Sequence, residues 1–411
     1  MKICGIIAEY NPFHTGHAFH IQKTREILGK DTAIVCVMSG NFVQRGDAAI
    51  MEKYQRARAA VRCGADLVLE IPLRAALSSA AGFAWGGVEL LHKLGCVDHL
   101  SFGSECGDLQ ALTQAARLLK SEELSEHLKN TLRSGLSYAA AQQQALASVS
   151  PQHGQLLETA NNTLGIEYLC ALHTMHSPIR PVTVMRTGAG HDAEQLSRSQ
   201  YPSASALRKM IFHGGSSECL PFLPAESAEE LYTALNRGAA PAALSQASAA
   251  MVSYFRRLSP AEIGRFTNGD DGLSNRLYQA IRSETDFDSI CQAAQTRCYP
   301  LARIRRTLLR IYLSIDDAVS PRAHYARVLA IGPAGRRILR AADSAAFPLI
   351  IKPTSERILL PAGLQPLLRL DELSDDLYAL MQPDTNLHVA GARFRKTPYV
   401  SPKVYLDFPT I

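Results

Sequence analysis

Residues 3–20, "ICGIIAEYNPFHTGHAFH", begin as a short apolar run and end with three histidines close together. The apolar run predicts a buried strand, because a parallel strand covered on both faces is apolar almost throughout. Asn11-Pro12 ends that strand, since proline cannot donate to a strand ladder and restricts the residue before it. A helix is predicted over residues 15–28. The stretch therefore predicts a strand, a tight loop and a helix that begins beside the carboxyl end of the strand.

The same alternation continues along the chain, with further strand-like runs at 33–40, 66–72, 97–105 and 180–188 and helix-like segments between them. Strands that alternate with helices pair in parallel, which predicts an α/β fold with a doubly wound parallel sheet. Residues 41–50 read as a loop, and 325–342 as a later strand, turn and helix. From about residue 220 the strand pattern fades, so we expect one domain over 1–220 and a mainly helical, basic region over 221–411.

Composition limits the class of protein. The 411-residue chain is 46% apolar and 20% charged, as folded globular proteins are. No apolar run approaches the roughly 18 residues of a membrane-spanning helix, and the N-terminus lacks the long apolar region of a secretory signal. We therefore expect a cytoplasmic protein with no membrane partner. Nine scattered cysteines without a Cys-x-x-Cys pair argue against a zinc site or a disulfide framework.

The histidines His14, His17 and His20 follow the first strand, at the edge where an open parallel sheet binds its ligands. His14 and His17 are three residues apart at a helix start, so both can reach the same phosphates. Gly16 permits close approach of a ligand, and a helix N-terminus favours an anion. The pattern predicts a polyphosphate site that stabilises departing pyrophosphate. Three ordinary surface histidines are the alternative, and we predict no metal at this cluster.

Polar residues that follow later strands are further candidates. Ser205 and Arg208 of "SASALR" suit the β- and γ-phosphates of a nucleotide, although a helix cap with a solvated arginine would look the same. Arg186 follows a strand end and suits an adenine or phosphate contact, with a surface arginine as the alternative. Glu105 suits ribose or magnesium, or else is a solvated loop acid.

Several motifs together resemble the tRNA(Met) cytidine acetate ligases, a family within the nucleotidyltransferases that carry a His-x-Gly-His signature. These motifs are "EYNPFHTGH", "MSGNFVQRGDAAI", "GADLVLEIP", "FGSE", "NNTLGIEYL" and "SASALR". The resemblance covers the first 210 residues strongly and "YPLARIRRTLLRIYL" more loosely. It implies a nucleotidyltransferase-like Rossmann fold with the ATP site and catalysis in residues 1–220, and tRNA binding in 221–411.

The resemblance also implies a reaction in two steps. Acetate attacks the α-phosphate of ATP to give acetyl-adenylate and pyrophosphate. The N4 amine of the wobble cytidine of elongator tRNA(Met) then takes the acetyl group, giving N4-acetylcytidine and AMP. ATP is thus the expected co-substrate, with Mg²⁺, and no protein partner is implied. A small-molecule adenylyltransferase of the same superfamily is the alternative, and a non-catalytic RNA adaptor that binds a nucleotide is a third reading.

The resemblance carries site residues over by position, with Asn161 as an alternative to Asn162. Together with Ser205 and Arg208, the expected ATP-binding residues are Ile7, Ala8, Glu9, Tyr10, Asn11, Pro12, Phe13, His14, Thr15, Gly16, His17, Ala18, Phe19, His20, Gly103, Asn162, Arg186 and Thr187. The expected catalytic residues are His14, His17, Asn11 and Arg45. Near Gln44 and Asp47, the Arg45 guanidinium could bind the acetate carboxylate with two hydrogen bonds, unless it simply pairs with Asp47.

Arginines are concentrated in the C-terminal half. Ten arginines and no lysine lie between residues 291 and 340, against two aspartates. Arg303, Arg306 and Arg310 fall on one face of a predicted helix, opposite an apolar face. We predict that this arginine stripe faces outward and binds tRNA phosphates, with "RFRK" at 393–396 adding charge. A solvated helix face without a partner is the alternative.

Overall fold

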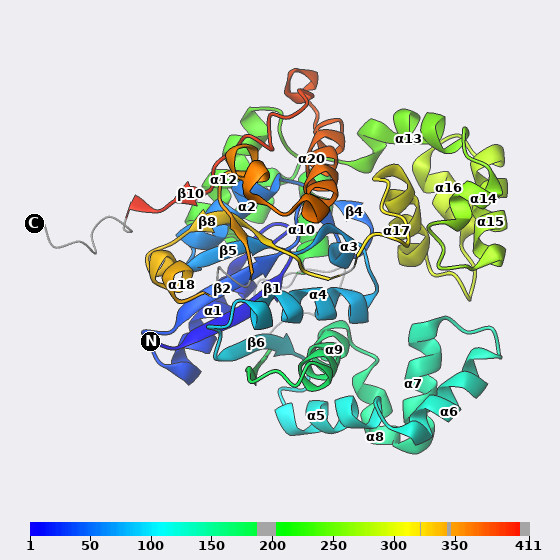
Figure 1. The fold of residues 1–411 in the computed structure, drawn as a ribbon, viewed down its shortest axis with the longest axis horizontal. Coiled ribbons are helices and arrows are strands. Elements are labelled where there is room, and N and C mark those ends of the chain that lie inside the picture. The colour runs from blue at the N-terminus through cyan, green and yellow to red at the C-terminus, as the bar shows by residue number, and fades with distance from the viewer. Residues whose placement is uncertain (187–202, 321, 343–346, 403–411) are drawn as a thin grey trace, which may run out of the picture.

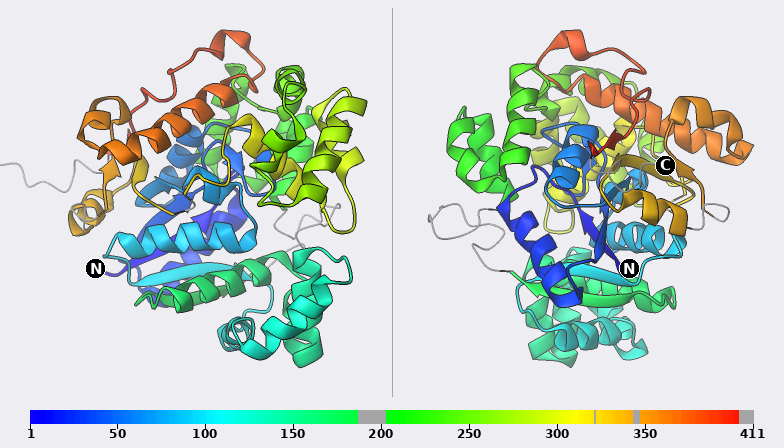
Figure 2. Two further views of the ribbon diagram at one scale, coloured as in Figure 1. Left: turned by 45° about the vertical axis from the view of Figure 1, so that its right-hand side comes forward. Right: turned by 90° about the vertical axis from the view of Figure 1, so that its left-hand side faces the viewer.

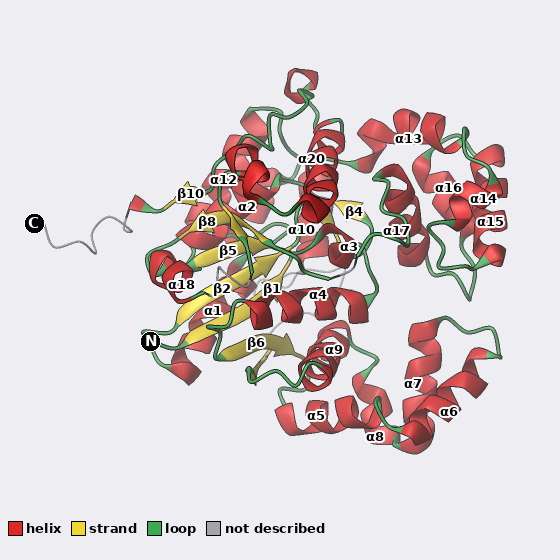
Figure 3. Ribbon diagram, in the orientation of Figure 1, coloured by secondary structure: helices red, strands yellow, loops and turns green. Residues whose placement is uncertain are grey.

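The computed structural model describes residues 1–186, 203–320, 322–342 and 347–402. Its centre is an eight-stranded sheet, drawn in yellow in Figure 3. The N-terminal part of the sheet is parallel and consists of β1 (Ile3–Ala8), β2 (Ala33–Met38), β5 (Leu67–Glu70), β6 (His99–Ser104) and β7 (Arg180–Met185). Their order in space is β5-β2-β1-β6-β7, so the winding reverses between β1 and β6. This arrangement confirms the predicted doubly wound α/β fold.

Helices cover both faces of this sheet (Figures 1 and 2). α4 (Ala80–Lys93) and α9 (Ala160–Thr174) pack in the core on one face, and α1 (Thr15–Leu28) and α2 (Lys53–Arg62) in the core on the other. Successive side chains of a strand point to opposite faces. In β2, Val35 and Val37 therefore enter the first core and Ile34 and Cys36 the second. All six residues of β2 are buried, which explains its unbroken apolar run.

The C-terminal half returns to this sheet. β8 (Ala326–Ile331) lies antiparallel beside β5, and β9 (Leu349–Ile350) and β10 (Tyr399–Val400) pair in parallel with β8. The strand, turn and helix expected over 325–342 correspond to β8 followed by α18 (Gly335–Ala341). The central sheet therefore continues across the boundary expected near residue 220.

The rest of the C-terminal half is mainly helical, as predicted. One helical core contains α13 (Ser248–Phe255), α15 (Asp271–Ser283), α16 (Phe287–Ala294), α17 (Leu301–Tyr312) and the end of α20 (Gln365–Ala379). Phe42 and Ala48 from the N-terminal half join this core. They belong to β3 (Phe42–Val43) and β4 (Asp47–Ala48), an antiparallel ribbon inside the segment expected to be a loop. Strands of two residues are too short to show a period in the sequence.

The remaining helices surround these cores. A lobe inserted between β6 and α9, at the lower right of Figure 1, contains α5 (Leu109–Leu118), α6 (Glu122–Leu132), α7 (Tyr138–Val149) and α8 (Pro151–Leu156). The other helices are α3 (Leu73–Ala76), α10 (Ala204–Phe212), α11 (Ser216–Cys219), α12 (Ala225–Asn236), α14 (Pro260–Gly264) and α19 (Pro353–Glu356). Within the described ranges, no helix is both long enough and apolar enough to cross a membrane.

Candidate active site

A cavity of about 710 Å³ opens beyond the carboxyl ends of β1 and β6, where the winding of the sheet reverses. This volume lies within the range of roughly 300–1,000 Å³ that is usual for small-molecule sites. The loop after β1, the start of α1, the ends of β6 and β7, and the start of α9 form its walls. The expected ATP-binding residues that line it are Ile7, Ala8, Glu9, Tyr10, Asn11, His14, Gly16, His17, Phe19, His20, Gly103 and Arg186.

The first turn of α1 fixes how two of these histidines present their rings. His14 occupies the N-cap position, and its Nδ1 accepts the backbone N–H of Gly16 at 3.0 Å. The backbone N–H of His14 in turn donates to Nδ1 of His17 at 3.2 Å. The two rings stack with their centroids 3.8 Å apart. Because each Nδ1 is an acceptor, the proton of each neutral ring sits on Nε2, which leaves Nε2–H as the remaining donor of each ring.

The electrostatics of the cavity keep these rings neutral. Burial, reinforced by the positive charges of Arg186 and Arg208, lowers the pKa of His14 to about 3. Burial, His14 and Arg186 hold the pKa of His17 well below its ordinary value. Burial and Arg186 lower the pKa of His20 to about 4. The same positive potential that disfavours a histidine proton favours a polyphosphate.

Polar contacts from residues that do not line the cavity hold the loop that joins β1 to α1. The Asn11 side chain accepts the backbone N–H of Ile50 at 2.9 Å. Arg208 donates to the carbonyl of Asn11 at 2.9 Å and to the Ser205 hydroxyl at 3.0 Å. Ser205 and Arg208 therefore support the histidine loop and are not among the residues that line the cavity, and their direct phosphate contact stays a prediction.

Asn161 and Asn162 have different positions, because α9 begins between the cavity and the core. Asn161 lines the cavity. Asn162 is buried, and its side-chain oxygen accepts the backbone N–H groups of Glu105 and Cys106 at 2.9 and 3.2 Å. The expected ATP contact of Asn162 thus falls on a residue that holds the loop after β6. The site residue suggested by this geometry is its neighbour Asn161.

Glu105 has a structural partner that neither sequence reading anticipated. Its carboxylate accepts the backbone N–H groups of Asn161 and Asn162 at 3.2 and 2.7 Å, at the start of α9. These hydrogen bonds hold the pKa of Glu105 below its ordinary value despite the burial that would raise it. The carboxylate therefore caps a helix while it also lines the cavity, so a ribose or magnesium contact stays a prediction.

The ends of β6 and β7 position Gly103 and Arg186 at another edge of the cavity. Arg186 follows β7, is exposed, and donates to the Asn161 side-chain oxygen at 3.5 Å. A side chain at Gly103 would approach Arg186 to 3.3 Å, so glycine leaves room for that arginine. Thr187, expected to contact ATP, lies outside the described residues. Four further residues of the expected set, Pro12, Phe13, Thr15 and Ala18, are not among the lining residues.

The segment expected to bind acetate reaches the same cavity, which Gln44 and Arg45 line. The backbone N–H of Gln44 donates to Glu9 at 2.8 Å, and its side chain donates to the carbonyl of Ser78 at 3.1 Å. Asp47 pairs with Arg305 of α17, with 3.3 Å between the two charged groups. Glu9 after β1, Ser78 after α3 and Arg305 of α17 thus hold this segment at the cavity.

Two sets of residues at the site escaped the sequence analysis. Phe102 and Tyr168 form an apolar wall of the cavity with ring centroids 5.8 Å apart, but apolar residues of a strand and a helix look like any core residues in a sequence. Arg56 of α2 is fully buried and donates to the carbonyls of Glu9, Met51 and Ser39. Arg56 stands among apolar residues of α2, but the sequence alone does not show whether such an arginine is buried or exposed.

The arginine stripe of α17 does not stand outward as predicted. Arg303 pairs with Asp270 at 3.0 Å, and Arg310 pairs with Asp317 at 2.5 Å with its side chain 11% exposed. Arg306 donates to the carbonyl of Gln44 at 3.2 Å. Burial, together with the neighbouring arginines, lowers its pKa to about 10. Asp270, Asp317 and the Gln44 loop satisfy these guanidinium groups, so tRNA binding by this stripe stays a prediction that its geometry does not favour.

With this geometry established, comparison with known proteins places the chain. Residues 1–391 match the family HIGH Nucleotidyl Transferase. A tRNA(Met) cytidine acetate ligase of Acetivibrio thermocellus is 34% identical, over 96% of this chain and 98% of that protein. One of Alkaliphilus metalliredigens is 36% identical, over 92% and 94%. This chain belongs to the tRNA(Met) cytidine acetate ligase family. Membership confirms the resemblance seen in its motifs and the enzyme class that it implied.

Solved structures agree with this membership. The crystal structure of apo Thermotoga maritima TmcAL superposes with a TM-score of 0.91 at 29% identity, over 97% of this chain and 99% of that one. The same protein bound with alpha-thio ATP superposes with a TM-score of 0.89 at 28% identity, over the same shares. An ATP analogue thus binds a member of the family with this fold.

Proposed function

We propose that this protein acetylates the N4 amine of the wobble cytidine of elongator tRNA(Met), using ATP and acetate. Family membership supports the class of reaction. In the structure, the proposal rests on one observation, the paired Nε2–H donors of His14 and His17 in a cavity of positive potential. Every residue that lines this cavity lies at or before Ala204, which supports placing ATP binding and catalysis in residues 1–220.

In the first step, an acetate oxygen attacks the α-phosphorus of ATP and the bond to pyrophosphate breaks. Negative charge grows on the α-phosphate and on the leaving pyrophosphate. The Nε2–H groups of His14 and His17 meet that charge with hydrogen bonds, and Arg186 adds a positive charge at the edge of the cavity. Preorganised donors of this kind usually contribute the largest part of catalysis. Because both rings stay neutral, they donate hydrogen bonds without transferring a proton.

In the second step, the cytidine N4 attacks the carbonyl carbon of acetyl-adenylate, the bond to the AMP oxygen breaks, and N4 loses one proton.

Arg45 is the group that we assign to the acetate carboxylate, since it lines the cavity and can donate two parallel hydrogen bonds. Asn11 holds the histidine loop to Ile50 and keeps the catalytic groups in register, which refines the catalytic role expected for it.

Magnesium enters this proposal through ATP. Among the described residues, no group of three histidine, cysteine, aspartate or glutamate side chains is placed to hold a metal ion. Mg²⁺ often relies on substrate phosphates with only one or two carboxylates, and Glu9 is a carboxylate in the cavity wall. The residues present therefore fit a magnesium ion that arrives bound to ATP. Such an ion would neutralise part of the negative charge of the phosphates. A tRNA substrate is consistent with the cytoplasmic location that we expect for this enzyme.

The test incubates the purified protein with ATP and elongator tRNA(Met), with and without acetate. The tRNA is then digested and its nucleosides are weighed by mass spectrometry. Acetylcytidine that forms only when ATP and acetate are both present is the expected result. Pyrophosphate release without acetylcytidine would favour the small-molecule adenylyltransferase. Absence of both products would favour the RNA adaptor.

A further inference from the structure

A second cavity, of about 530 Å³, lies between α2, the residues after α12 and the C-terminal segment. None of the residues that line it also lines the histidine cavity. The two cavities are nevertheless connected by a short stretch of chain. Ile50 is hydrogen-bonded to Asn11 of the histidine cavity, and Glu52, two residues further on, lines the second cavity. Two residues of chain span at most about 7 Å, so one macromolecule could occupy both cavities at once.

The second cavity is positively charged. Arg58, Arg237, Arg393 and Lys396 line it, and Glu52 is the carboxylate in the same lining. Glu52 pairs with both Arg393 and Lys396, so one acid orients two cations and neutralises only one of them. Arg237 is exposed, and its side chain makes no hydrogen bond or ion pair in the part of the chain that the structure describes. The cavity therefore keeps an excess of positive charge that internal contacts leave uncompensated.

Several polar atoms around this cavity also lack partners. Arg58 Nε, Arg393 Nε and Gln55 Oε1 are buried without a hydrogen bond. Arg393 Nε has the Glu52 carboxylate as an ion-pair partner at 3.5 Å, whereas Gln55 Oε1 and Arg58 Nε have no such partner. Buried polar atoms nearly always have a partner, so these two atoms beside one cavity need an explanation. Gln55 and Arg58 are one turn apart on α2, where an acceptor and a donor suit a ribose hydroxyl and a phosphate oxygen. We favour an RNA backbone as the occupant because the cavity is basic and lies close to the site of the proposed tRNA reaction.

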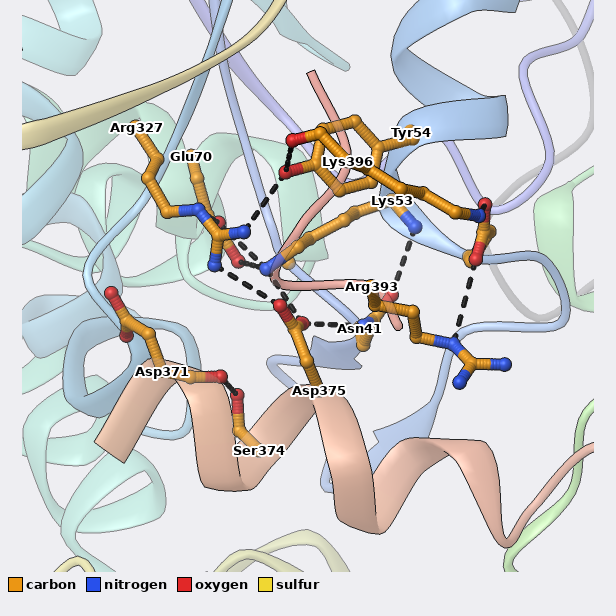
Figure 4. A network of polar contacts seen from close by, with 12 residues as sticks. Asn41, Lys53, Tyr54, Glu70, Arg327, Asp371, Ser374, Asp375, Arg393 and Lys396 are labelled. Atoms are coloured by element: carbon orange, nitrogen blue, oxygen red, sulfur yellow. Dashed lines mark hydrogen bonds and ion pairs between the residues drawn. The ribbon is translucent and has the colours of Figure 1, made fainter. Parts of the chain in front are cut away.

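A buried network of charges holds the wall that carries these groups. Lys53 on α2 pairs with Glu70 and Asp375 at 2.8 and 2.7 Å, and Arg327 pairs with Asp375 at 3.1 Å (Figure 4). The hydroxyl of Tyr54, which lines the cavity, accepts from Arg327 at 2.9 Å and donates to the carbonyl of Lys396 at 3.3 Å. Helix α2, β8 and the C-terminal segment are thus locked together, and the cavity is preformed.

We propose that the second cavity binds the sugar-phosphate backbone of the tRNA, close to the nucleotide whose base enters the histidine cavity. The inference rests on the proposed function, because it assigns a place to the substrate of that reaction. The "RFRK" segment at 393–396 takes part through Lys396, whereas Arg393 is buried and pairs with Glu52. The arginines of the α17 stripe already pair with groups of the protein itself, so we assign the main RNA anchor to this cavity and not to α17.

The test measures the affinity for an elongator tRNA(Met) transcript between 50 and 200 mM salt. Each phosphate contact contributes about 0.7–0.9 to the slope of log K against log salt. We expect the double variant Arg58→Gln/Arg237→Gln to flatten that slope by about 1.5, and Arg237→Gln alone by about half as much. The single variant guards against misfolding, because Arg58 pairs with buried Glu230 whereas Arg237 has no such contact. Arg133→Gln, exposed in the α5–α8 lobe, is the matched control for charge.

Pyrophosphate release from ATP and acetate, measured without tRNA, should be the same in all four proteins. Wild-type slopes in both the double and the single variant would overturn the proposal. Loss of pyrophosphate release in these variants would also overturn it, because the cavity would then serve ATP. A flattened slope in an enzyme that makes no acetylcytidine would uphold the RNA site while the proposed function fails, so the two results are distinguishable.

Discussion

Replacing His14 by asparagine should separate the two roles of this residue. Its Nδ1 accepts the backbone N–H of Gly16 at 3.0 Å and so caps α1, whereas its Nε2–H is the donor that we assign to ATP. The side-chain oxygen of asparagine can take the place of Nδ1, and asparagine is a favoured capping residue. It has no donor at the position of Nε2. His14→Asn should therefore keep the helix cap and lose the donor, while His14→Ala loses both.

The magnitudes follow from these two contacts. Losing one preorganised donor at a site of developing charge slows a reaction by about 10²–10³, or about 2.7–4 kcal/mol. Both variants should show this loss. Losing the cap costs about 0.5–2 kcal/mol of stability. Only His14→Ala should show that second loss, and the 4% exposure of His14 means that its truncation also leaves buried space.

The assays are pyrophosphate release with saturating ATP and acetate, and unfolding by urea. His173→Asn is the control, because His173 is exposed in the last turn of α9 and should change neither quantity by much. A wild-type rate in His14→Asn would show that the Nε2 donor is not used. Equal unfolding free energies for His14→Asn and His14→Ala would show that the Nδ1 contact does not stabilise α1.

Two further predictions concern stability and use the same urea measurement. Burial and the nearby arginines lower the pKa of His14 from 6.5 to about 3, so below about pH 6.5 the unfolded chain binds a proton that the folded chain does not. The unfolding free energy should therefore fall as pH drops from 6.5 towards 3, and this histidine contributes up to about 1.4 kcal/mol per pH unit. The slope of unfolding free energy against pH should be shallower in His14→Asn. Equal slopes in the two proteins would contradict this prediction. Asp375→Asn leaves Lys53 and Arg327 short of a buried counter-charge and should cost about 3–5 kcal/mol. Glu372→Gln breaks a half-exposed pair with Arg357 and should cost under about 1 kcal/mol, so losses of similar size would refute the argument from burial.

Local patterns were sufficient for most of the fold. The helix expected over 15–28 is α1, with the same bounds, because its cap and its periodic face are both local signals. Ser203 caps α10 through the backbone N–H of Ala206, which is again a local signal. The antiparallel pairing of β8 with β5 could not be predicted, because hydrogen bonding between strands so distant in sequence leaves no local trace.

The candidate site divides in the same way. The histidine pair follows from a strand, a loop and a helix start, which are contiguous in the chain. The choice between Asn161 and Asn162 depended on how α9 rotates against the loop after β6, which no period reveals. The partners of Arg306 and Arg303 are Gln44 and Asp270, which are distant in sequence, so a stripe that looked solvated in sequence is mostly engaged.

By itself, the sequence determined the order of strands and helices, the place of the histidines at a strand end, and the family. Those properties depend on apolar periodicity, on capping and on contiguous motifs, and each acts over a few residues. Only the tertiary structure decided which nitrogen of each histidine is left free of the helix start, which arginines pair within the protein, and where a second basic cavity forms. These properties depend on hydrogen bonds and ion pairs between residues up to several hundred positions apart, such as Glu52 with Lys396, which only the packed chain brings together.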